Sequence, residues 1–193
     1  MESSYLNCEV GEFLDLVARR QPAPGGGAVA AIAMSLAAGL VAMVARYSRG
    51  LDDADRLVET ADRLREDVAT LADDDAHAYG RVIEAYAAAR DNPGDQPNRI
   101  SDALRGAAQV PLTVAEAGAD ICEVAARLAV EGKPDVRGDA MTALLLAEAA
   151  TRTSAHLVTV NVEAAGDGED LVERAVRSVA AAHAAVATAQ PVA

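Results

Sequence analysis

Aromatic residues and positive charge are both scarce in this 193-residue chain, which has no Trp, one Phe and four Tyr. Sandwiches and barrels are built from strands rich in aromatic and β-branched residues, so the scarcity argues against an all-β protein. The chain has only 17 Lys and Arg residues but 30 Asp and Glu residues, which gives a formal net charge of −13. Nucleic acids and anionic membranes both recruit basic surfaces, so we predict that neither is a partner.

Cysteine and histidine are also few. Cys8 and Cys122 lie far apart, and the three histidines (His77, His156 and His183) are scattered without a ligand-like spacing. We therefore predict no metal site, and two free thiols in a reducing compartment. The first ten residues are polar and acidic rather than basic and then apolar, so no targeting signal is predicted and a cytoplasmic location is expected.

Alanine is what the chain has in abundance, with 46 residues in a sequence that is 51% hydrophobic. Alanine is the strongest helix former because it loses no side-chain entropy on folding. The composition predicts an all-α protein, and the length suggests one domain over residues 1–193. We expect about six long antiparallel helices that pack closely through small side chains.

Apolar spacing and the Gly and Pro clusters place these helices. The first shows an apolar face of Val10, Phe13, Leu14 and Val17. The second has eighteen residues without a charge, 28–45, and its many alanines favour a buried central helix over a membrane span. The expected helices are residues 10–20, 28–47, 52–90 with Asp52 as cap, 98 or 101–131 with a kink or break at Pro111, 139–161 and 169–188.

A glycine turn, Pro24-Gly25-Gly26-Gly27, stands directly before the second helix. Glycine lets a ligand approach the backbone, and a helix start offers unpaired N–H groups and the positive end of the helix dipole. The turn can therefore bind a carboxylate or phosphate. It lacks the Lys-Ser/Thr pair of a nucleotide-binding loop, and the alternative is a tight turn that only lets two helices pack.

An acidic run, Asp73-Asp74-Asp75, lies inside the expected third helix. Steps of three and four from the apolar positions Leu64, Val68 and Leu71 land on Asp75, which places this carboxylate on the apolar face. Burial would raise the pKa of Asp75 and suit it to proton transfer near neutral pH. The alternative is a buried aspartate that holds an arginine or a helix end.

A third cluster, residues 132–139, gathers two cations and two carboxylates around glycines. Lys133 and Arg137 supply the positive charges, and Asp135 and Asp139 the negative ones. The cluster can bind an anionic ligand, or it can be a capped turn with Asp139 as the N-cap of the fifth helix.

These three clusters in this order resemble the cyclodeaminase and methenyltetrahydrofolate cyclohydrolase family, found also as the C-terminal domain of formiminotransferase-cyclodeaminase. Further similar stretches are Val110-Pro111-Leu112-Thr113-Val114-Ala115-Glu116 and Val160-Asn161-Val162. The resemblance implies an all-helical homodimer that acts on a tetrahydrofolate, with a pocket lined by the glycine turn and the region of Asp75. Three positions depart from the family's usual residues: Lys133 and Leu157 replace asparagines, and Gly138 replaces a serine.

The expected reaction is hydrolysis of 5,10-methenyltetrahydrofolate to formyltetrahydrofolate, without a cofactor. The alternatives are ring closure of formimidoyltetrahydrofolate with ammonia release, and a helical dimer that binds folate or anions without catalysis. Asp75 is expected to balance the substrate's positive charge and shuttle protons, while Asp139 and Asn161 orient the pterin or the water. The other expected binding residues are Pro24, Gly25, Gly26 and Gly27 for a carboxylate or a developing oxygen, Lys133 and Arg137 for the glutamate tail, and Tyr79 for the pterin.

Overall fold

Long helices make up nearly all of the computed structural model, which describes residues 4–91 and 96–189. They are α1 (Val10–Ala18), α2 (Gly26–Tyr47), α3 (Ala54–Asp91), α4 (Gln96–Glu131), α5 (Arg137–Ala165) and α6 (Glu169–Ala189). Two short 3₁₀ turns, η1 (Tyr5–Asn7) and η3 (Pro134–Val136), precede α1 and α5. No strand occurs in the described ranges, and the all-α prediction is confirmed.

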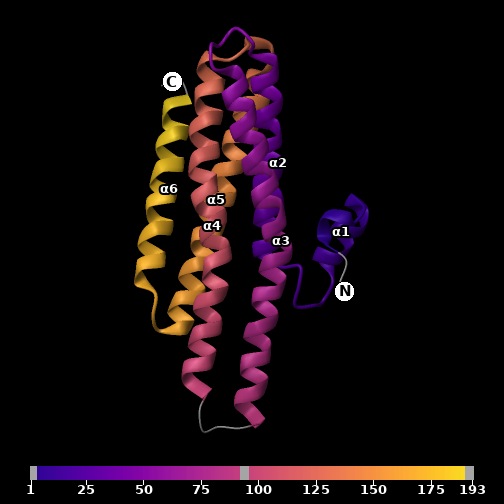
Figure 1. Ribbon diagram of the computed structural model, residues 1–193, viewed down its shortest axis with the longest axis vertical. Helices are drawn as coiled ribbons and strands as arrows, with labels where there is room; N and C mark the ends of the chain where they lie inside the picture. The colour runs from indigo at the N-terminus through magenta and orange to yellow at the C-terminus, as the bar shows by residue number, and fades with distance from the viewer. Residues whose placement is uncertain (1–3, 92–95, 190–193) are drawn as a thin grey trace.

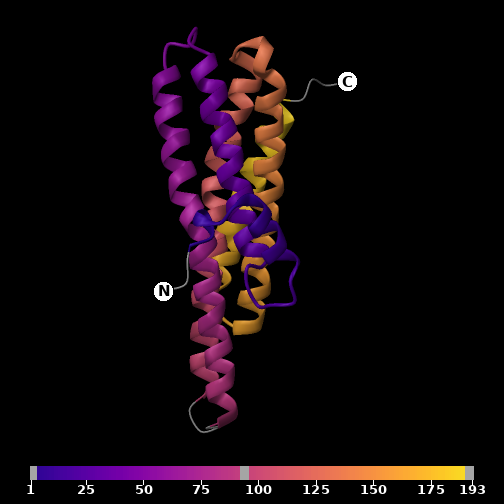
Figure 2. The same ribbon diagram turned by 90° about the vertical axis from the view of Figure 1, so that its right-hand side faces the viewer.

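Helices α2 to α6 pack side by side as a bundle, and short connections turn the chain back at each end (Figure 1). Helix α2 contacts α3, α4 and α5, while α6 packs on α4 and α5. In both views α3 and α4 extend beyond the other helices at the lower end (Figures 1 and 2). The start of α2 therefore lies against the middle of α3, not against its end.

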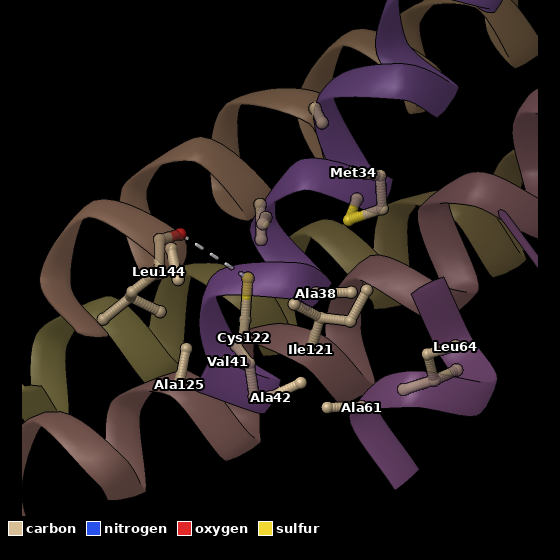
Figure 3. Packing of buried hydrophobic residues seen from close by; sticks show 14 of the residues in the cluster. Met34, Ala38, Val41, Ala42, Ala61, Leu64, Ile121, Cys122, Ala125 and Leu144 are labelled. Atoms are coloured by element: carbon tan, nitrogen blue, oxygen red, sulfur yellow. Dashed lines mark hydrogen bonds between the residues drawn. The ribbon is translucent and has the colours of Figure 1, made fainter. Parts of the chain in front are cut away.

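Small side chains hold the centre of the bundle together (Figure 3). Ala38 and Ala42 of α2 are at most 1% exposed and belong to the same cluster as Ile121 and Cys122 of α4. A Cβ atom added at Gly118 of α4 would collide with side chains of two other helices, Thr151 of α5 and Met34 of α2. This close approach of three helices is what the alanine and glycine content makes possible.

Helix α2 is only partly the central helix that the sequence predicts. Among the described residues it is the one helix long and apolar enough to cross a membrane, and 56% of its most apolar 18-residue window is buried in the bundle. Its remaining face is open: Val29, Leu36 and Tyr47 are 39%, 62% and 58% exposed. The expected burial thus holds on the sides that meet α3, α4 and α5.

Helix α1 has the predicted position but buries none of its residues. The apolar side chains of Val10 and Leu14 are 78% and 63% exposed. Figure 1 shows α1 standing to one side of the bundle. The segment is attached near its start, where the backbone N–H of Tyr5 donates to Oδ1 of Asp73 at 2.8 Å and the Tyr5 ring meets Phe13 edge-on.

Three local predictions are wrong. Helix α3 begins at Ala54, so Asp53 rather than Asp52 directly precedes it, and there Asp53 accepts two hydrogen bonds from Arg127 of α4. Pro111 does not break its helix, because α4 runs without interruption from Gln96 to Glu131, and the alternative of a kink at Pro111 stays a prediction. Asp139 is not the N-cap of α5, since this helix begins two residues earlier, with Val136 as its cap residue.

Candidate active site

The start of α2 is held against Asp75 in the middle of α3. The backbone N–H of Ala28 donates to Oδ2 of Asp75 at 3.0 Å. A Cβ atom added at Gly27 would coincide with the Asp75 carboxylate. Glycine is therefore required at this position, because any side chain would push the carboxylate away from the helix start.

The anion at this helix start is thus the protein's own. The sequence predicts a substrate carboxylate or a developing oxygen at Gly25–Gly27, and it predicts separately that Asp75 faces the substrate. The structure joins the two features: Asp75 takes the Ala28 N–H and lies at the positive end of the helix dipole. The hydrogen bond from Ala28 therefore shows that Asp75 holds a helix end, which is the alternative interpretation of this aspartate.

The carboxyl group of Asp75 is also suited to proton transfer. Burial is the main influence on its pKa and raises it above the ordinary value of 3.8, while the hydrogen bond from Ala28 lowers it by less. The carboxyl is only half-buried. A carboxyl that is reachable, and whose charged form is disfavoured, can exchange protons closer to neutral pH than an ordinary aspartate.

A cavity of about 270 Å³ opens beside this carboxylate. Six of the predicted site residues line it together: Gly25, Gly26, Gly27, Asp75, Asn161 and, one turn beyond Asp75 on α3, Tyr79. Pro24 is buried behind the turn, with a cis peptide bond before it, and is not among the lining residues.

The other residues that line this cavity are not among the predicted site residues, and all five are apolar: Pro22, Ala23, Ala107, Leu157 and Val160. Leu157 was recognised only as a departure from the family pattern. It lies one helical turn before Asn161, whose side-chain Nδ2 donates to the Leu157 carbonyl at 3.0 Å. Ala107 of α4 carries no sequence signal, because a small buried residue of a helix looks the same in a pocket wall as in a core.

Lys133, Arg137 and Asp139 lie at the other end of the bundle. The backbone N–H of Lys133 donates to Oγ of Ser48, which follows the last residue of α2. The cavity lies at the first residues of α2, and 22 helical residues span roughly 33 Å. Within one chain these three residues therefore do not reach the cavity, and the prediction that they share its site is wrong for the single chain.

Known proteins resemble this chain over most of its length, including the residues of the cavity. The profile of a family described as formiminotransferase-cyclodeaminase matches residues 9–181. A methenyltetrahydrofolate cyclohydrolase of Methylorubrum extorquens is 31% identical over 178 residues, which cover 87% of this chain and 86% of that protein. The formimidoyltransferase-cyclodeaminase of Sus scrofa is 29% identical, and the match covers 84% of this chain but 32% of the longer protein.

A solved structure extends the likeness to the fold. The crystal structure of a formiminotetrahydrofolate cyclodeaminase from Thermotoga maritima superposes with a TM-score of 0.86 at 26% identity, covering 95% of this chain and 94% of that one. The profile match spans most of the chain and includes the glycine turn, Asp75 and Asn161. This chain therefore belongs to the formiminotransferase-cyclodeaminase family.

Proposed function

We propose that the protein is an enzyme that hydrolyses 5,10-methenyltetrahydrofolate to formyltetrahydrofolate. The observation that carries the proposal is the half-buried carboxylate of Asp75, set at the start of α2 and exposed to a mostly apolar cavity. The 31% identical relative named methenyltetrahydrofolate cyclohydrolase, which the match covers almost completely, supports this choice of reaction.

The chemistry that this site must perform is modest. The substrate carries a cationic amidinium carbon, and an adjacent anion stabilises the cation. Water forms a bond to that carbon and gives up a proton to Asp75, which leaves a neutral tetrahedral adduct. The carbon–nitrogen bond to one ring nitrogen then breaks, and the nitrogen takes the proton back from Asp75. The remaining hydroxyl gives its proton to solvent water as the formyl carbonyl forms, so that one proton is released in each turnover.

The other polar groups have supporting roles in this proposal. Asn161 orients the water from the α5 side of the cavity, and Tyr79 offers its ring to the planar substrate. The reaction needs neither a resident metal nor a redox cofactor in this account, and the two free cysteines suit a cytoplasmic location.

Cyclodeamination of formimidoyltetrahydrofolate is the second candidate, and the crystal structure with a TM-score of 0.86 favours it. Both reactions pass through adducts on the same carbon. Purified protein should therefore be offered the methenyl and the formimidoyl substrates in parallel. We expect loss of the methenyl absorbance without ammonia. Ammonia release from the formimidoyl substrate alone would assign the second activity, and tight folate binding without either turnover would mark a binding protein.

We further propose that two copies pair through the open face of α2. Leu36, at 62% exposed, lies at the midpoint of the 22-residue helix. A two-fold axis beside Leu36 would lay the two α2 helices antiparallel, so that the start of one meets the end of the other. Covering Val29, Leu36 and Tyr47 would remove apolar side chains from water.

Charge complementarity supports this antiparallel pairing. Acidic residues surround the start of α2, where Asp73, Asp74 and Asp75 lie on α3. Three cations lie near its end: Arg49 and Arg137 have no ion pair within the described ranges, while Nζ of Lys133 lies 3.0 Å from Oδ2 of Asp135 and 5.8 Å from the ring centre of Tyr47. In the pair, the partner's Lys133 and the partner's Arg137 approach the cavity, where they suit the carboxylates of a glutamate tail.

Light scattering after size exclusion tests the pairing. We expect twice the chain mass of 19.8 kDa for the wild type, and a monomer for Leu36→Glu. Val176→Glu on α6, where the native valine is 59% exposed, is the matched control and should stay dimeric. Mixing Asp75→Asn with Arg137→Glu protein should restore activity if the site is shared. A monomeric wild type with full activity would contradict the pairing and leave the reaction standing.

A further inference from the structure

A second cavity, of about 830 Å³, lies between the N-terminal arm and α3. The arm is residues 4–23, comprising η1, α1 and the chain that leads to the glycine turn. This cavity shares Pro22, Ala23 and Tyr79 with the smaller cavity beside Asp75. Ligands of drug-like size occupy pockets of about 300–1,000 Å³, so the 270 Å³ cavity alone holds only part of a folate. The adjoining space is where the rest of the molecule can lie.

The polar lining of this second cavity comprises neutral groups, among them Ser4 and Gln21, the imidazole of His77, and two carboxylates. Glu12 of α1 and Asp73 of α3 contribute carboxylates, and none of the described lining residues is Lys or Arg. The pKa of the Cys8 thiol in the same wall is raised, first by desolvation and then by the negative charges of Glu12 and Asp73. The cavity therefore disfavours the anionic glutamate tail of a folate and favours a group rich in hydrogen-bond donors.

Flat and apolar surfaces complete the wall. Tyr5 and Tyr79 line it from opposite elements, and Ile83 is exposed one turn further along α3. Gly80 also lines it, and a Cβ atom added there would meet nothing within 4 Å, so the helix backbone itself is open to the cavity. A chain with so few aromatic residues thus places two tyrosines around one space suited to a planar ring.

We propose that this second cavity holds the pterin ring of the reduced folate, with Asp73 and Glu12 accepting hydrogen bonds from its amino group and ring N–H. The inference rests on the proposed folate substrate. The cationic one-carbon bridge then lies at the shared wall near Tyr79, within reach of Asp75, and the benzoyl group lies against the apolar residues of the smaller cavity. The tail leaves toward solvent, away from the carboxylates.

The charge of Asp73 can be removed while the hydrogen bond that attaches the arm is kept. Its Oδ1 accepts the Tyr5 N–H, which attaches the arm, and Asp73→Asn keeps an oxygen for that bond while it removes the charge. Hydrogen bonds to a charged acceptor are stronger than neutral ones, so we expect Asp73→Asn to weaken folate binding about tenfold. Asp74→Asn, which changes an exposed neighbour outside the cavity, is the matched control and should bind as the wild type does.

The test is calorimetric titration with 5-formyltetrahydrofolate, a reduced folate without the amidinium, and with its analogue that lacks the pterin 2-amino group. The wild type should prefer the complete ligand by about tenfold, and Asp73→Asn should lose this preference. Gly80→Leu, which fills the cavity from an open helix position, should weaken binding at least tenfold without loss of thermal stability.

Equal affinity of the wild type, Asp73→Asn and Gly80→Leu for the complete ligand would overturn the pterin site. If the wild type binds with the expected preference but does not turn over either substrate, the pterin site stands and the proposed reaction fails. If it binds no folate at all, both are overturned.

Discussion

Asp75 combines two roles that pull in opposite directions. Its carboxylate stabilises the start of α2, yet burial raises its pKa, so the charged form is disfavoured in the folded protein. A raised folded-state pKa means that the native state binds the proton more tightly than the unfolded chain does. The stability contributed by this group is full below its unfolded pKa and declines as pH rises through the folded pKa.

Replacing Asp75 by Asn should therefore not destabilise the protein at pH 7. The amide oxygen can still accept the Ala28 N–H, and the cost of burying a charge is gone. We expect an unfolding temperature equal to or above that of the wild type, measured by circular dichroism. A clearly lower value would show that the charge itself holds the helix start.

The two cysteines should differ sharply in reactivity. Cys122 is fully buried, burial raises its pKa to about 12, and its Sγ faces the Leu144 carbonyl at 3.9 Å. Cys8 is half-buried in the arm. Thiolates rather than thiols react, so a disulfide reagent at pH 8 should label one thiol of the native protein and both in denaturant. Two equally fast native thiols would contradict the packing of α4 against α5.

At the level of the helices, close approach depends on particular glycines. Gly118 of α4 faces Thr151 and Met34 with no room for a side chain, whereas Gly106 of the same helix has open space around it. Gly118→Ala should cost about 1–3 kcal/mol through overpacking. Gly106→Ala should instead stabilise by up to about 1 kcal/mol, because alanine is the better helix former. Urea unfolding compares the two, and equal effects would contradict the three-helix contact.

The helix termini also explain which local predictions failed. Capping residues such as Asp139 are recognised by type, but several acidic residues often stand within one turn of a helix start. Here α5 begins at Arg137, directly after the 3₁₀ turn of Pro134–Val136, and Asp139 falls inside its first turn. The sequence pattern finds a helix start to within about two residues, and the backbone geometry decides the rest.

For the molecule as a whole, the sequence predicted the helices and half of the candidate site. The alanine content and the Gly and Pro clusters predict where the helices lie. The apolar spacing that reaches Asp75 identifies a carboxylate that does line a cavity. Only the family resemblance groups Lys133, Arg137 and Asp139 with Asp75. Spacing along one chain does not tell which end of a bundle a loop occupies, nor that α1 and α2 leave apolar side chains open.

The rate of methenyl absorbance loss with wild-type and Asp75→Asn protein tests the central claim most directly. We expect wild-type activity whose kcat/KM falls on the acid side with an apparent pKa above 3.8, because burial raises the pKa of Asp75. Asp75→Asn should lose about 10²–10⁴-fold in kcat and show no such acid limb, although it remains folded. Unchanged turnover by the folded variant would contradict the account.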